Sequence, residues 1–221
     1  MSRSVWGANW IARPPRHTNE WHRSEIGAVA LRFAVFLARH DSGIGWNPPY
    51  APGEKLTYGR GVARLDIPPG DGGDAVQLWT LRPEMGAAVN RLVDAAYNKS
   101  ILPVRVREAA RMRIAQLNDC TVCLAFRADS VKAQGLTEEF YCHVGGHDEG
   151  ASFSGQERLA MQYAERFAMD HLSIDDEFME RMRGAFTDPE ILDLTICLAA
   201  FLGLGRTLRA LGITDTSLTD V

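Results

Sequence analysis

The chain has 221 residues, of which 46% are hydrophobic and 24% are charged, and its formal net charge is −4. A chain of this length and composition can bury a core without disulfide staples. The slight acidity argues against nucleic-acid binding, which usually needs a basic face. The apolar run over residues 27–38 contains Arg32, lacks a signal-peptide cleavage site and is too short to span a bilayer. We therefore expect a cytoplasmic protein with no membrane segment.

The first part of the chain, residues 1–60, differs in character from the rest. It carries several Trp and Arg residues and predicts an arm of unknown role with one short helix over residues 25–39, capped by Ser24. Residues 43–73 are dense in Gly and Pro, which is typical of a loop or linker. An alternative is that translation begins later, near Val62. In either case residues 61–221 are expected to form the main domain.

Two proline-led segments open the main domain. Pro83 precedes apolar residues at helical spacing, and Pro103 does the same one segment later, which predicts two helices that begin at these prolines. The second of them carries a single apolar stripe made of Val106, Ala110, Ile114 and Leu117.

Three later segments begin with a capping-box pattern. The boxes are expected at Ser154–Glu157, Ser173–Asp176 and Thr187–Glu190, the last with Pro189 in the first helical turn. The final segment, residues 191–211, is apolar nearly all round, which indicates burial in a core or a subunit interface. No alternating strand pattern follows residue 75. The sequence therefore predicts an all-α domain, an antiparallel helical bundle with short loops.

A Cys-x-x-Cys pair stands out in the middle of this domain. Asp119 is expected to cap a helix that runs from Cys120 to about Gln134, with Cys120 and Cys123 on one face and Arg127 on the same face. Free N–H groups at a helix start and a nearby guanidinium can lower a thiol pKa from about 8.5 to roughly 3.5–7.5. The spacing predicts a nucleophilic thiol with a second thiol within reach to close a disulfide.

Other interpretations of the two cysteines remain open. Downstream, Cys142, His143 and His147 offer further zinc ligands, although the residues after Cys123 predict a continuous helix rather than the tight turn of a zinc knuckle. The pair could also be two small core residues, since free cysteine is often buried. A thioredoxin-like motif is disfavoured because a helix, not a strand, precedes the cysteines.

The stretch "LPVRVREAARMRIAQLNDCTVCLAFRADSVKAQGLTEE" resembles the signature of the alkylhydroperoxidase D / carboxymuconolactone decarboxylase family. Glu108 on one helix and Cys120 and Cys123 at the start of the next match in type and spacing, and the resemblance extends over residues 62–213. It implies an AhpD-like all-α fold that assembles as a trimer or hexamer. It also implies a peroxidase that acts through redox-active cysteines on a small hydroperoxide, with a thiol or dithiol electron donor and no metal or organic cofactor.

The resemblance also implies roles for the individual residues. Cys123 would attack the O–O bond, Cys120 would close the disulfide, and Glu108 would deliver a proton if burial raises its pKa. The family's usual His is replaced by Arg127, which keeps a positive charge near the thiol but transfers no proton.

Several alternatives to these roles stay open. Glu108 could instead pair with Arg111 or Arg127, and a base could come from His143, His147 or His171. The chain could also be a lactone decarboxylase, although such relatives generally lack the cysteine pair, or a helical oligomer without catalysis.

Overall fold

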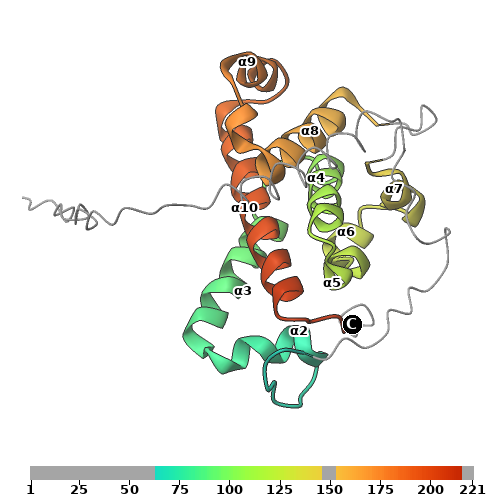
Figure 1. Ribbon diagram of the computed structural model, residues 1–221. Coiled ribbons are helices and arrows are strands. Elements are labelled where there is room, and N and C mark those ends of the chain that lie inside the picture. Colours follow the sequence, from blue (N-terminus) through green and yellow to red (C-terminus); the bar gives the residue numbers. More distant parts are fainter. Residues whose placement is uncertain (1–62, 146–152, 216–221) are drawn as a thin grey trace, which may run out of the picture. The chain divides into compact units, whose positions relative to one another are not determined.

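In a computed structural model the chain is described over residues 63–145 and 153–215. The helix predicted over residues 25–39, its cap Ser24 and the predicted domain boundary near residue 60 lie outside these residues. Within residues 63–145 and 153–215 the structure contains helices and no strands, which confirms the all-α prediction (Figure 1). The elements are α2 (Gly73–Gln77), η1 (Leu78–Leu81), α3 (Pro83–Asn98), α4 (Val104–Leu117), α5 (Thr121–Ala125), α6 (Asp129–Lys132), α7 (Glu138–His143), α8 (Gly155–Met169), η2 (His171–Ser173), α9 (Asp176–Ala185) and α10 (Asp188–Ala210).

Helix α4 is the central element of the domain, packed against both α8 and α10 (Figure 1). Every residue from Val106 to Ala115 is buried, so the apolar stripe predicted for this helix is only one of its covered faces, and Leu117 at its end is half-buried. The largest core cluster joins α4 to α8, α9 and α10 through side chains such as Ile114, Tyr163, Phe178, Met182, Leu194 and Leu198. A helix enclosed on all sides brings whatever charged residues it carries into the interior.

The predicted helix starts are mostly confirmed. Pro83 lies in the first turn of α3, Pro103 is the N-cap residue of α4, and complete capping boxes begin α8 at Ser154 and α10 at Thr187. The box predicted at Ser173 is wrong, because that residue ends η2. Asp175 caps α9 instead, its carboxylate accepting a hydrogen bond of 2.8 Å from the backbone N–H of Phe178.

Helix α10 runs along the domain, with α3, α4 and α5 packed against it (Figure 1). By length and composition it could cross a membrane, with a mean hydropathy of 1.7 over its most apolar window, but Leu194 and Leu198 are fully buried in the domain core. Two of its large apolar side chains, Leu192 and Ile196, are 61% and 48% exposed. They are four residues apart and therefore lie on one face of the helix.

The long helix predicted over residues 120–134 is wrong. Helix α5 ends at Ala125, and Phe126 takes an extended backbone with φ −67° and ψ 131° before the short α6 begins. The Phe126 ring packs against the edge of Tyr97, with ring centroids 5.7 Å apart, and the Arg127 guanidinium donates to the carbonyls of Leu124 and Phe126. These contacts satisfy carbonyls that a continuing helix would otherwise use.

The capping role predicted for Asp119 is also wrong. Its backbone lies in the left-handed region with φ 49°, and its carboxylate pairs with Arg209 on α10 at 2.9 Å. Cys120 is the residue that caps α5.

Candidate active site

The two cysteines of the Cys-x-x-Cys pair form a disulfide with their Cα atoms 5.2 Å apart. The Cys120 sulfur also accepts a hydrogen bond of 3.2 Å from the backbone N–H of Cys123, so it serves as the side-chain cap of α5. Cys120 is only 1% exposed, whereas Cys123 is half-buried. A reactant can therefore reach Cys123 more readily than Cys120.

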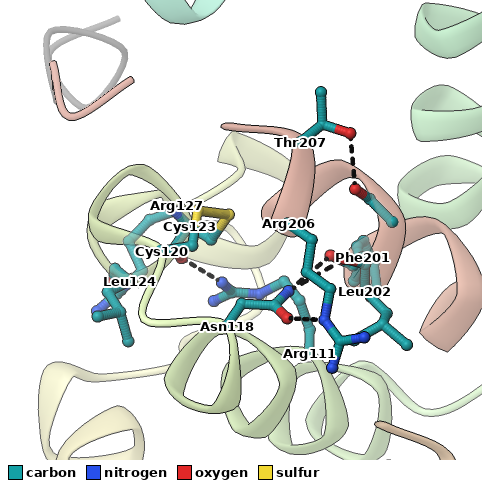
Figure 2. Close-up of a disulfide and its surroundings, with 11 residues drawn as sticks. Arg111, Asn118, Cys120, Cys123, Leu124, Arg127, Phe201, Leu202, Arg206 and Thr207 are labelled. Carbon is teal, nitrogen blue, oxygen red and sulfur yellow. Dashed lines mark hydrogen bonds between the residues drawn. A yellow bond between two sulfur atoms is a disulfide. The ribbon is translucent and has the colours of Figure 1, made fainter. Parts of the chain in front are cut away.

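The turn that carries the disulfide is fastened to α10. The Asn118 side chain donates to the carbonyls of Phe201 and Leu202 and accepts from Arg206 (Figure 2). Gly205 permits this close approach, because a Cβ there would lie 2.5 Å from the Asn118 amide nitrogen and 3.4 Å from the Cys123 sulfur. The backbone of α10 thus lies directly against the disulfide.

A buried group of charges lies beneath the disulfide on α4. The side chains of Arg107, Glu108 and Arg111 are 4%, 1% and 3% exposed. Glu108 accepts hydrogen bonds through Oε2 from Arg111 Nε at 2.9 Å and from the Tyr141 hydroxyl at 3.2 Å. The pairing of Glu108 with Arg111 therefore occurs, and Glu108 is not a surface carboxylate. Two guanidinium groups against one carboxylate leave this group with one excess positive charge.

Arg111 connects this group to the cysteines. Its NH1 donates to the Cys123 carbonyl at 2.7 Å, which Figure 2 shows as a contact reaching the disulfide turn from α4. Its NH2 is buried and has no hydrogen-bond partner within the described part of the chain. The pKa of Arg111 is raised, because Glu108 and the neighbouring tyrosines outweigh the lowering effect of burial. The guanidinium that contacts Cys123 is therefore that of Arg111, which the sequence indicated only as a partner of Glu108.

Arg127 does not occupy the position that the helical spacing predicted for it. Its guanidinium forms a two-pronged ion pair with Glu138, at 2.8 Å and 2.9 Å, and stacks 3.9 Å above the Tyr141 ring. Because α5 ends at Ala125 and Phe126 is extended, helical spacing does not relate Arg127 to the cysteines. Its observed contacts hold the segment after α5 onto α7.

Replacing Arg127 should therefore affect stability more than thiol chemistry. We expect Arg127→Ala to lower the free energy of unfolding by about 1 kcal/mol through the lost stacking and ion pair. The rate at which iodoacetamide alkylates Cys123 in the reduced protein should change less than about twofold, measured against pH by peptide mass. Arg209→Ala, which removes an exposed pair with Asp119, is the matched control. A several-fold slower alkylation in Arg127→Ala alone would restore the predicted electrostatic role.

An apolar cavity of about 610 Å³ lies between α3 and the disulfide turn. Helices α4 and α5 contribute Arg111 and Cys123 to its lining, and α2, η1, α3 and α10 also line it. Among its lining residues Arg111 is the one charged side chain, with Thr80, Asn90 and Tyr97 as the further polar ones. Most of the lining is apolar, formed by Val76, Trp79, Val89, Val93, Ile114, Val122, Phe126, Phe201, Leu204 and Leu208, among others.

Neither His143 nor His171, the candidate bases that the structure describes, lines this cavity. His143 contacts the Glu139 carbonyl through Nδ1, His171 is exposed in η2, and His147 lies outside the described residues. Within residues 63–145 and 153–215 no group of three or more His, Cys, Asp or Glu side chains is placed to hold a metal ion. Cys142 and Cys197 are free thiols, and burial raises the pKa of Cys197 to about 12.

The fold and the site together define a helical domain with a cysteine pair at the start of a short helix, beside a buried Glu and an apolar cavity. Residues 83–166 match the carboxymuconolactone decarboxylase family. That segment contains Glu108, both cysteines and Arg127. The expected resemblance is thereby confirmed for the residues that carry the site.

Solved structures and a curated relative are also similar to this chain. An uncharacterized peroxidase-related protein from Silicibacter sp. TM1040 has a TM-score of 0.59 and 16% identity, covering 67% of this chain and 89% of that one. The alkylhydroperoxidase AhpD core of an uncharacterized peroxidase-related protein from Ralstonia eutropha JMP134 has a TM-score of 0.52 and 15% identity, covering 84% of each chain. The uncharacterized protein YdfG of Bacillus subtilis is 22% identical over 139 residues, 62% of this chain and 93% of its own length. The structural matches show an AhpD-like helical fold.

Proposed function

We propose that this protein is a thiol-dependent peroxidase that reduces organic hydroperoxides through the Cys120–Cys123 pair. The observation that carries the proposal is the placement of the disulfide: half-buried Cys123 lines an apolar cavity, while Cys120 is buried behind it. An attacking thiol needs access to the substrate, and a resolving thiol needs only to reach its partner. The apolar lining suits an organic hydroperoxide better than hydrogen peroxide.

The proposed cycle uses one hydroperoxide and one dithiol donor. The Cys123 thiolate attacks the terminal oxygen of R–O–O–H, the O–O bond breaks, and Cys123 becomes a sulfenic acid while the alkoxide takes up a proton and leaves as R–OH. The Cys120 thiol then attacks the sulfenic sulfur, releases water and forms the disulfide. An external dithiol returns both cysteines to thiols and is itself oxidised. The disulfide form is the one in this structure.

The proton for the leaving alkoxide is proposed to come through the buried Glu108 and its tyrosine neighbours. Burial raises the pKa of Tyr97 and of Tyr141 above the usual range, so both phenols stay protonated at neutral pH. Tyr97 lines the cavity, and the Tyr141 hydroxyl donates to Glu108. These contacts support a route in which Glu108 holds a proton network rather than touching the substrate directly.

A stoichiometry experiment tests the proposal. The reduced protein should consume one equivalent of cumene hydroperoxide per chain without a donor, with two thiols lost and the Cys120–Cys123 disulfide found by peptide mass. Added dithiothreitol should make the reaction catalytic. Reduced protein that consumes no hydroperoxide while its thiols remain intact would overturn the peroxidase proposal. A lactone decarboxylase or a non-catalytic oligomer would give that result.

We also propose a homo-oligomer, such as a trimer or hexamer, assembled through α10. The support is the exposed apolar pair Leu192 and Ile196 on one face of that helix. Light scattering on the full chain should give a mass of several chains, and the double substitution Leu192→Arg with Ile196→Arg should reduce it. A wild-type mass equal to one chain at micromolar concentration would contradict this proposal.

A further inference from the structure

The cavity beside Cys123 combines an apolar lining with one positively charged end. Arg111 is its one charged lining residue, and its side chain is 3% exposed. Three of the guanidinium's contacts are accounted for: Nε binds Glu108, NH1 binds the Cys123 carbonyl, and the plane lies 5.6 Å from the Tyr141 ring centroid. The remaining nitrogen, NH2, is buried without a partner in the described part of the chain.

A buried N–H donor without a partner is costly, and more so when it is charged. The excess positive charge of the Arg107, Glu108 and Arg111 group adds to this cost, because a buried charge needs a counter-charge. Both tyrosines beside the group remain neutral, so they supply no negative charge. An anion bound at the end of the cavity that Arg111 lines would neutralise the group.

We propose that the cavity binds a ligand with an apolar body and a carboxylate end, the carboxylate pairing with the Arg111 guanidinium. A cavity of about 610 Å³ lies within the usual range for a small organic ligand. The acidic residues Asp71, Asp94 and Asp129 and the basic Arg127 line a neighbouring hollow that shares Asn90 and Tyr97 with this one, but none of the four lines the cavity itself. Arg111 is enclosed, so salt screens its attraction for an anion less than it screens a charge on the surface.

This inference narrows the substrate class and, in that part, rests on the proposed peroxidase function. Arg111 donates to the backbone carbonyl of Cys123, and both residues line the cavity, so a carboxylate held at Arg111 keeps its ligand beside Cys123. The inferred substrate is an apolar carboxylic acid that carries a hydroperoxide near its carboxylate, as an α-hydroperoxy acid does. Attack by the Cys123 thiolate on the terminal oxygen gives the sulfenic acid and, after proton uptake by the alkoxide, the corresponding hydroxy carboxylate. The dithiol donor closes the cycle as before.

A binding experiment tests the ligand without any turnover. Octanoate and octanol share one apolar chain, and calorimetry on the full-length oxidised protein should show octanoate binding about tenfold or more tightly, as expected for a charge-assisted hydrogen bond. Arg111→Met should abolish this difference in affinity and leave the affinity for octanol unchanged. Arg127→Met is the matched control: it removes the same charge from a guanidinium engaged by Glu138, and it should leave octanoate affinity within about twofold.

A second variant keeps the binding test valid if Arg111→Met does not fold. Asn90 is exposed and lines the cavity, so Asn90→Asp adds a negative charge there without disturbing the core. This substitution should weaken the binding of octanoate and leave the affinity for octanol unchanged. Equal affinity for octanoate and octanol in the wild type, or an octanoate preference that survives Arg111→Met, would overturn the inference.

A turnover experiment separates this inference from the proposed function. With dithiothreitol as donor, kcat/KM for α-hydroperoxyoctanoate should exceed that for its methyl ester about tenfold or more, and Arg111→Met should remove the preference. Turnover of both compounds at equal efficiency would refute the carboxylate inference and still support the proposed peroxidase function. Octanoate binding that depends on Arg111, with no turnover of either compound, would refute the peroxidase function and still support the proposed carboxylate ligand.

Discussion

Cys123→Ser should lower hydroperoxide turnover about a thousandfold or more, because it removes the nucleophile that lines the cavity. Cys120→Ser should behave differently. Serine still accepts the hydrogen bond that caps α5, so the turn keeps its shape while the resolving thiol is lost. The reduced Cys120→Ser protein should consume one equivalent of hydroperoxide, accumulate a sulfenic acid at Cys123 that dimedone can trap, and then slow sharply.

The two remaining described cysteines supply the controls for this experiment. Cys197 is buried with its pKa raised to about 12, and Cys142 also has a raised pKa, so neither should react appreciably near neutral pH. Cys142→Ser and Cys197→Ser should therefore keep wild-type turnover. If Cys123→Ser retains turnover and Cys142→Ser loses it, the active site does not lie at Cys123.

The second large effect concerns stability. Glu108→Gln should lower the free energy of unfolding by about 3–5 kcal/mol, because it leaves Arg107 and Arg111 buried without a counter-charge. For a domain of this size that loss corresponds to a fall in Tm of roughly 6–20 °C. Urea denaturation of the oxidised proteins measures it. Glu138→Gln is the matched control, since Glu138 is 64% exposed, and it should cost at most about 1 kcal/mol.

A double substitution checks that charge, rather than packing, causes the loss. Glu108→Gln combined with Arg111→Met restores one excess positive charge, as in the native group, so the double variant should be more stable than Glu108→Gln alone. If Glu108→Gln unfolds within about 1 kcal/mol of the wild type, Glu108 does not balance the buried guanidinium groups. Its role would then be limited to hydrogen bonding with Tyr141.

The sequence predicted those parts of the structure that depend on local signals. Proline at the start of α3 and α4 and the capping boxes at Ser154 and Thr187 each act within one helical turn, so neighbouring residues determine them. The spacing of Cys120 and Cys123 likewise predicted two thiols close enough to form a disulfide, and the structure contains that disulfide. The pairing of Glu108 with Arg111 was among the alternatives because the two residues are one helical turn apart.

The sequence did not predict the features that depend on contacts between residues far apart in the chain. Nothing in the sequence near Phe126 marks a helix end, since the break depends on the Tyr97 ring and on carbonyl contacts from Arg127. The helical spacing that related Arg127 to Cys123 consequently does not apply. The cavity is formed by α2, η1, α3 and α10 around the disulfide turn, residues far apart in sequence, and the free NH2 of Arg111 becomes significant only once that cavity is known.

The positions around Cys123 differ in how freely their residues can change during evolution. On the α10 side the sulfur faces backbone at Gly205, where even one methyl group would press on Asn118, so that position tolerates little change. On the opposite side α3 contributes exposed residues such as Ala87 and Asn90, which no buried contact restrains. Relatives can therefore acquire new substrate preferences through α3 while the thiol chemistry stays the same. Libraries that aim to alter selectivity should likewise vary α3 and leave α10 untouched.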